Sequence, residues 1–243
     1  FLYSAYLGRK LTLEEFGLVS LMSSLFALTS VVTGSLGKTI THRSAYLYGK
    51  YVHPVKEFWA HIRTRSIIVS LILALLWFVS IPFLQYFFKS ESPIPFLLFT
   101  PIWAVGLAGA VDSGFLGGSL KFVLIGCLML VEATTKLTIT YALVKLGLSH
   151  LVYAAIPASA LFSFLLGWIA IVRIKNVAQK VPEEEVKSFP KAFLGTSVLT
   201  ILSSVAFLSL DVVLAKFYLS PVEAGEYALL ALAGKMIHRC LLA

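Results

Sequence analysis

Ionisable side chains inside apolar stretches are the residues of this chain whose type and spacing could do chemistry. Glu132 and Lys136 lie four residues apart in the apolar stretch 121–146. On a helix they would stand about 40° apart and one turn along, so they could pair. An unpaired charge at mid-membrane costs roughly 2.5–3.5 kcal/mol, which makes each a candidate functional residue. We interpret Glu132 as a proton or cation site and Lys136 as a site for an anionic group, with a purely structural pair as the alternative.

A second set of cations follows near the end of the sequence. Lys235, His238 and Arg239 are spaced three and one residues apart. Lys235 lies ten residues past Gly225, or about 15 Å along a helix. Two cations close together on a helix need water or an anion as partner, so Lys235 and Arg239 are predicted to bind an anionic headgroup.

Two aspartates lie nearer the ends of their apolar stretches. Asp112 and Asp211 are candidates for ion coupling or for charge pairing. The structural alternatives are that Asp112 braces the adjacent turn and that Asp211 pairs locally. No nucleophile elbow, phosphate loop or metal-ligand motif is present, and we expect neither enzymatic activity nor a cofactor or metal.

The composition indicates whether the elements that hold these residues are surrounded by water or by lipid. The chain has 243 residues, of which 58% are hydrophobic and 13% charged, and its mean hydropathy is +0.89. Soluble domains carry about 25% charged residues. We therefore predict an all-α integral membrane protein, because no strand alternation of the barrel type is visible.

Six apolar stretches are each long enough to cross a bilayer. We predict complete spans at about 16–36, 66–88, 96–118, 121–146, 151–172 and 192–217. Residues 1–7 and the stretch from 225 onward are incomplete spans, so we expect a piece of a longer polytopic protein. Gly106, Ala110, Gly114 and Gly118 recur every fourth residue in the fourth stretch, which predicts a ridge for tight helix packing.

The connections between the spans are unequally charged. Twelve Lys and Arg residues fall in 37–65, in 173–191 and at Lys121, against five in the connections of the other side. The positive-inside rule places loops 37–65 and 173–191 in the cytoplasm. It also accounts for the net charge of +8, so we expect membrane lipids and no nucleic acid as partners. An alternative is that these loops also contact anionic lipid headgroups. Within 37–65, residues from Pro54 to Ile62 are predicted to form a helix lying in the membrane interface.

Two turns of the sequence echo one another. Leu11, Thr12, Glu15 and Gly17 match 219, 220, 223 and 225 at a constant offset of 208 residues. An echo at this distance, across six hydrophobic stretches, is typical of an internally duplicated membrane protein. The charge asymmetry places both turns on the same side, as a parallel repeat of six helices requires.

The same turns resemble a known family. YLGRKL at 6–11 followed by EEFG at 14–17 is similar to a turn of polysaccharide flippases, and DVVL at 211–214 followed by LSPVEAGEY at 219–227 is similar to a second one. The chain thus resembles the O-antigen-type polysaccharide flippases of the multidrug/oligosaccharidyl-lipid/polysaccharide exporter superfamily. It departs from the first turn at Leu13, where proline is usual, and at Lys10, an added charge.

The resemblance implies two six-helix bundles around a central cavity. Residues 1–191 would form the first bundle and 192–243 the first helices of the second. The implied activity is to flip a polyprenyl-diphosphate-linked oligosaccharide from the inner to the outer leaflet of the plasma (inner) membrane, for cell-surface polysaccharide or lipopolysaccharide. Glycan-assembly proteins would be further partners. The diphosphate would be received by the cations Lys136, Lys235 and Arg239.

Two other functions compete with this interpretation. A multidrug extruder of the same superfamily would favour a cavity dominated by carboxylates, whereas the intramembrane set holds three acids, three bases and His238. A membrane glycosyltransferase or polymerase would need a large outward loop with acidic residues, and the outward connections here are short.

Overall fold

The computed structural model describes residues 2–90, 92–174 and 181–241, within which the side chains of residues 2, 4, 5, 207, 208 and 236–241 are excluded. The described residues form helices and no strand. In chain order the helices are α1 (Leu2–Lys10), α2 (Leu13–Tyr51), α3 (Lys56–Phe87), α4 (Ile94–Gly118), α5 (Phe122–Lys145), a 3₁₀ turn η1 (Ser149–Ala154), α6 (Ala155–Val172), α7 (Glu183–Lys187), α8 (Lys191–Tyr218) and α9 (Pro221–Leu241).

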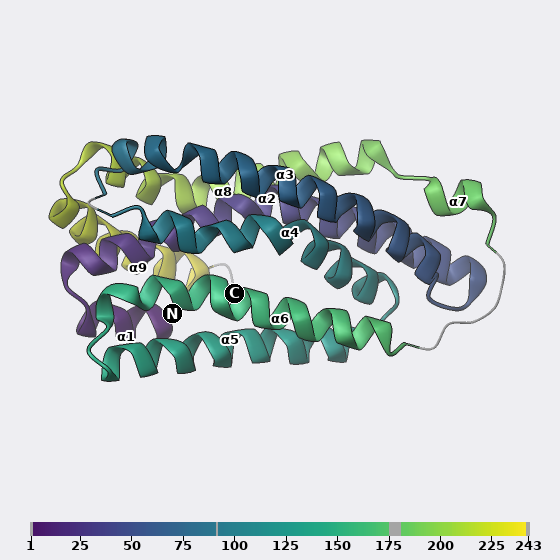
Figure 1. Cartoon of the computed structure of the whole chain (residues 1–243), viewed down its shortest axis with the longest axis horizontal. Coiled ribbons are helices and arrows are strands. Elements are labelled where there is room, and N and C mark those ends of the chain that lie inside the picture. Colours follow the sequence, from purple (N-terminus) through teal and green to yellow (C-terminus); the bar gives the residue numbers. More distant parts are fainter. Residues whose placement is uncertain (1, 91, 175–180, 242–243) are drawn as a thin grey trace.

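The long helices run side by side along one axis, and the chain reverses at the two ends of the bundle (Figure 1). Six segments of the described chain are long and apolar enough to cross a membrane, which makes this a multi-pass membrane protein. One end carries the α2–α3 and α4–α5 connections and α7, and the opposite end carries the α1–α2 and α8–α9 turns (Figure 1). The predicted spans are confirmed to within a few residues, apart from the length of α2 and α3.

The prediction of a polar loop at 37–65 is wrong. α2 continues as one helix to Tyr51, and α3 begins at Lys56, so only residues 52–55 connect them. The polar residues are helical extensions beyond the hydrocarbon core, because 39 and 32 residues exceed the roughly 20 that a crossing needs. The interfacial helix is also wrong: Phe58 and Ile62 do share a face, but they are buried in a core with Val111 and Phe115 of α4.

The predicted small-residue ridge of α4 explains why α2 stays helical. A Cβ added to Gly114 would lie 2.6 Å from the carbonyl oxygen of Gly37, and one added to Gly118 would lie 2.4 Å from Cβ of Ser44. The ridge therefore packs backbone to backbone on the part of α2 that was expected to be a loop. This close packing supplies van der Waals contact that lipid chains cannot match.

The two echoed turns fold alike and meet. Thr12 and Glu15 form a capping box at the start of α2, in which each side chain bonds the other's backbone N–H. Ser220 and Glu223 make the same pair of hydrogen bonds at the start of α9. A Cβ added to Gly17 would lie 3.4 Å from Cα of Gly225, so the first turns of α2 and α9 cross in contact.

The segment before α8 is fastened to the extension of α2. The predicted helical turn after Pro182 is present as α7, and its Glu185 accepts a salt bridge from Lys50. Arg43 donates a hydrogen bond of 2.8 Å to the carbonyl oxygen of Glu185. At the start of α8, the ring of Phe193 stacks on His42 with ring centres 4.5 Å apart. These contacts set the position at which α8 enters the bundle.

Candidate functional site

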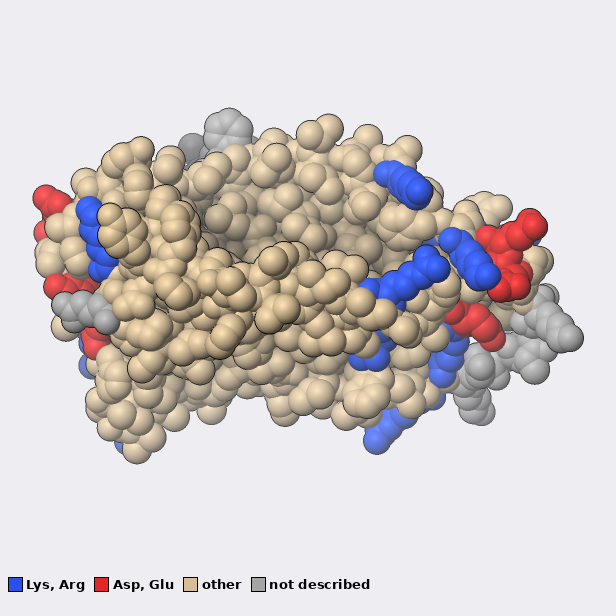
Figure 2. Space-filling view, turned by 45° about the horizontal axis from the view of Figure 1, so that its top comes forward, with Lys and Arg blue, Asp and Glu red and all other residues tan. Residues whose placement is uncertain are grey.

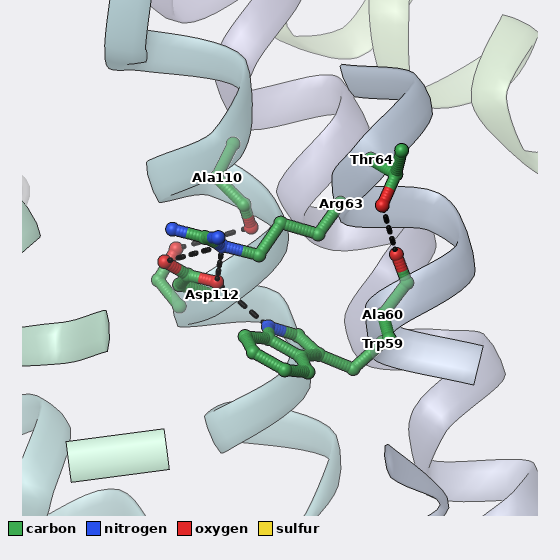
Figure 3. A network of polar contacts seen from close by, with 7 residues as sticks. Trp59, Ala60, Arg63, Thr64, Ala110 and Asp112 are labelled. Atoms are coloured by element: carbon green, nitrogen blue, oxygen red, sulfur yellow. Dashed lines mark hydrogen bonds and ion pairs between the residues drawn. The ribbon is translucent and has the colours of Figure 1, made fainter. Parts of the chain in front are cut away.

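The most enclosed charge of the described chain is Asp112, which α4 places against α3. Its carboxylate accepts a hydrogen bond of 2.7 Å from Nε1 of Trp59 and one of 3.1 Å from Nε of Arg63. Both donors extend from α3 across the helix interface to the carboxylate (Figure 3). Asp112 and Arg63 have side-chain exposures of only 4% and 14%, so this is a buried ion pair.

Aromatic rings surround the cation of this pair. The guanidinium carbon of Arg63 lies 5.4 Å from the ring centre of Trp59, 5.6 Å from that of Phe164 and 5.4 Å from that of Trp168. Ring faces attract a cation, so the guanidinium is stabilised by both the carboxylate and the rings. Asp112 was predicted for ion coupling or charge pairing, and the structure places it in a pair.

Arg63 and Trp59 were not predicted as members of a site, because Arg63 was assigned to the polar loop. One sequence signal could have found them. Trp59 and Arg63 are four residues apart, so they share a helical face near the same end of the bundle as Asp112. A buried carboxylate needs a donor from a neighbouring helix, and α3 is the element that precedes α4 in the chain.

A cavity of about 510 Å³ lies beside this pair, among α2, α4, α5 and α6. Asp112 and Glu132 both line it, together with Lys38 and the hydroxyl-bearing Thr33 and Ser113. The structure thus brings together two of the predicted carboxylates, which the sequence had placed in separate sites. Because Arg63 balances the charge of Asp112, the charges left to this cavity are those of Glu132 and Lys38.

Glu132 and Lys136 form no salt bridge, although both side chains belong to the described part of the chain. The ammonium nitrogen of Lys136 lies 4.9 Å from the ring centre of Tyr3 on α1. The structural pair, which was the alternative for these residues, is not formed, and Lys136 instead makes a cation–π contact with α1.

A different cavity, of about 460 Å³, lies between α1, α2, α8 and α9, and we call it the serine cavity. Its hydroxyl-bearing lining consists of Ser20, Ser23, Ser24, Ser30, Ser204, Ser209 and Tyr3. Within the described structure, the hydroxyls of Ser20, Ser23, Ser24 and Ser209 find no hydrogen-bond partner. Unpartnered hydroxyls in a cavity are free to bind water or a polar ligand.

Among the described lining residues of the serine cavity, Lys235 is the one cation. Its ammonium nitrogen lies 3.1 Å from a carboxylate oxygen of Asp211, and the two side chains are 24% and 29% exposed. Asp211 and Lys235 were assigned different roles, but α8 and α9 place them as one ion pair. The predicted anion site at Lys235 is thus already balanced by a carboxylate. The side chain of Arg239 lies outside the described residues.

Small residues on α2 make room for this cavity. Ser23, Ala27 and Ser30 face it, while a Cβ added to Gly34 would lie 3.2 Å from Ile201 of α8. α2 and α8 therefore approach closely near Gly34 and separate toward the first turn of α2. The stripe of small residues serves helix packing at one end and lines a cavity at the other.

Charges outside these sites gather at the two ends of the molecule. Figure 2 shows basic side chains concentrated at the end that carries α7 and a smaller mixed group at the other, with an uncharged band between. Such a band is what a protein presents to the hydrocarbon core of a bilayer. Among the described residues, no three His, Cys, Asp or Glu side chains are grouped to hold a metal ion.

Comparison with protein-family models, with curated proteins and with solved structures gives no match.

Proposed function

We propose that this protein is a transporter that moves a lipid-linked oligosaccharide from the inner to the outer leaflet of the cell membrane. The observation that carries the proposal is the serine cavity, with its unpartnered hydroxyls and one ion pair. Sugars are recognised mainly through hydrogen bonds, and hydroxyl groups can both donate and accept them. A mostly uncharged, hydroxyl-rich lining suits a polar cargo that has to be both bound and released, because each hydrogen bond that it offers is weak.

The ion pair supplies a way to receive the diphosphate of such a cargo. When the cargo binds, the ammonium group of Lys235 would leave the carboxylate of Asp211 and bind a phosphate oxygen. When the cargo leaves, Lys235 would pair with Asp211 again. Charge-assisted hydrogen bonds are about twice as strong as neutral ones, so this exchange would be close to balanced. Lys136 would add a second positive charge near the cargo, because it contacts the ring of Tyr3, whose side chain lines the serine cavity.

The arrangement of the helices supports alternating access around this cavity. Residues 1–191 would form a first bundle and 192–243 the start of a second. The equivalent capping boxes of α2 and α9 cross at one end, as expected for parallel repeats. The end with the greater number of basic side chains would face the cytoplasm. Rocking of one bundle against the other would then open the cavity to either side.

The test is surface glycan display in a host lacking its own flippase, with the protein quantified in the membrane. Lys235→Gln should lower display at least about tenfold, because it removes the phosphate partner. The double variant Lys235→Gln, Asp211→Asn should restore protein level without restoring display. Lys145→Gln, which removes an exposed cation at the end of α5, is the matched control and should leave display unchanged. Normal display with Lys235→Gln would contradict the proposal.

A second function, export of organic cations, is favoured by the other cavity. Glu132 lines it and has no salt-bridge partner among the described residues, and a carboxylate in this state attracts cations. Under this alternative, Glu132→Gln would abolish ethidium efflux from cells, and Lys235→Gln would not. Measuring both glycan display and ethidium efflux for each of the two variants distinguishes the two functions.

A further inference from the structure

An apolar groove lies on the lipid-facing side of the molecule, apart from both cavities. It has a volume of about 450 Å³ and runs between α3 and α8, with α2 and Leu107 of α4 as its floor. Val32 of α2 and Val69 of α3 line it and remain 44% and 46% exposed. The two outer helices therefore stand apart and leave part of α2 uncovered.

One end of the groove is basic. Arg65 of α3, Lys187 of α7 and Lys191 of α8 are its charged lining residues, and all three are exposed. Lys187 forms a salt bridge with Glu183. In the described structure neither Arg65 nor Lys191 has a salt-bridge partner. The groove contains no acidic lining residue among those described, so its charged end is complementary to an anion.

The apolar part descends from these cations toward the middle of the membrane. On α8, Leu194 and Val198 follow Lys191 at three and seven residues, so the lining reaches about 10 Å beyond the ammonium at 1.5 Å per residue. On α3, Val69 follows Arg65 by about 6 Å in the same direction. Figure 2 shows a face that is hollowed along its uncharged band, with basic side chains bordering the hollow toward the α7 end.

We propose that this groove binds one anionic phospholipid of the surrounding leaflet. Its phosphate lies between Arg65 and Lys191, and one acyl chain lies along Leu194 and Val198. Arginine suits this role because its planar fork can donate two hydrogen bonds to one phosphate. The predicted cytoplasmic leaflet is also the one that carries anionic lipids.

The shape of the groove selects this occupant. An apolar volume of about 450 Å³ accommodates an acyl chain, whereas a polyprenyl chain of many isoprene units would exceed it. An extended protein segment is a poorer fit, because beyond its basic end the groove offers only Ser66 to pair with a backbone. The bound lipid would join α3 to α8 and so stabilise the contact between the first bundle and the helices that follow residue 191. Binding of this lipid is independent of the cargo that the protein transports.

The experiment measures lipid binding to the purified protein in detergent, by native mass spectrometry and by thermal unfolding. Phosphatidylglycerol should bind and raise the melting temperature, whereas phosphatidylcholine and inorganic phosphate should not. The double variant Arg65→Gln, Lys191→Gln should bind phosphatidylglycerol about tenfold more weakly. Lys89→Gln with Lys145→Gln removes the same charge at the other end and should bind as the original chain does.

A second variant keeps both cations and blocks the groove. Val198→Trp should reduce phosphatidylglycerol binding, whereas Leu199→Trp, at a neighbouring residue that is 68% exposed and outside the groove lining, should not. Three outcomes would overturn the proposal. They are unchanged binding in both groove variants, equal binding of phosphatidylcholine, and equal stabilisation by inorganic phosphate, which would show a free-anion site.

Discussion

The buried pair of Asp112 and Arg63 should be among the most sensitive points of the fold. Asp112→Asn keeps an acceptor for Trp59 but leaves the guanidinium, which is 14% exposed, without a countercharge. Removing one partner of a buried pair costs about 3–5 kcal/mol, and the three rings around Arg63 offset part of that. A chain of this size loses about 2–4 °C of melting temperature per kcal/mol, so we expect a drop of about 6–20 °C.

The double variant distinguishes pairing from packing. Arg63→Met should cost a similar amount, because it leaves the carboxylate with Trp59 alone. Asp112→Asn combined with Arg63→Met removes both charges and should lie well above either single variant in melting temperature. Glu183→Gln, which breaks the exposed pair with Lys187, is the control and should shift it by less than about 4 °C.

The assay is thermal unfolding of the purified protein, followed by tryptophan fluorescence or by loss of a monodisperse peak after heating. Strict additivity of the two single effects in the double variant would refute the reasoning. It would mean that each side chain contributes through its own packing and that the 3.1 Å contact carries no coupling energy.

Three further predictions concern the orientation of the bundle, the close contact at Gly225 and the capping pair of Ser220 and Glu223. In a cysteine-free background, His150→Cys should react with an impermeant maleimide from outside and Gly49→Cys should not; the reverse labelling would invert the proposed orientation. Gly225→Ala should destabilise the protein strongly, because its Cβ would lie 2.1 Å from a carbonyl oxygen of α2, whereas Gly234→Ala, with open space around it, should be neutral or stabilising in melting temperature. The Ser220 backbone N–H donates to Glu223 and holds the pKa of that carboxyl below its ordinary value of 4.5. Glu223→Gln should therefore lower the melting temperature at neutral pH, and the difference should vanish as pH falls below that value, because the stabilising charge is then lost; a difference that persists in acid would contradict this.

Hydrophobic runs were sufficient to predict the spans, because each crossing must bury about twenty apolar residues in lipid. The α4 ridge was also predictable, since small residues at every fourth position are typical of close helix packing in membranes. The length of α2 was not. Polar residues after Gly37 indicated a loop, but the partner surface that keeps them helical is Gly114 and Gly118, far along the sequence.

The charged sites were predictable as residues but not as pairs. Asp112 is 49 residues from Arg63, and Asp211 is 24 residues from Lys235. Spacing on one helix suggested that Glu132 would meet Lys136, yet the approach of α1 gave Lys136 an aromatic ring instead. Side-chain pairing between helices depends on their relative rotation, which a single sequence does not encode in any local pattern.

The first turns of α2 and α9 are in contact, so α2 is held close to one of its ends and extends far beyond that contact. Its 39 residues form a rod about 58 Å long, and the backbone contact at Gly17 and Gly225 lies within two turns of one tip. A tilt of only about 5° around that contact would move the opposite tip by roughly 4.5 Å, because displacement grows with distance from the pivot. Any such tilt would be largest near Tyr51, so the packing of this arm on α4 and the contacts of Lys50 and Arg43 with α7 are what would resist it.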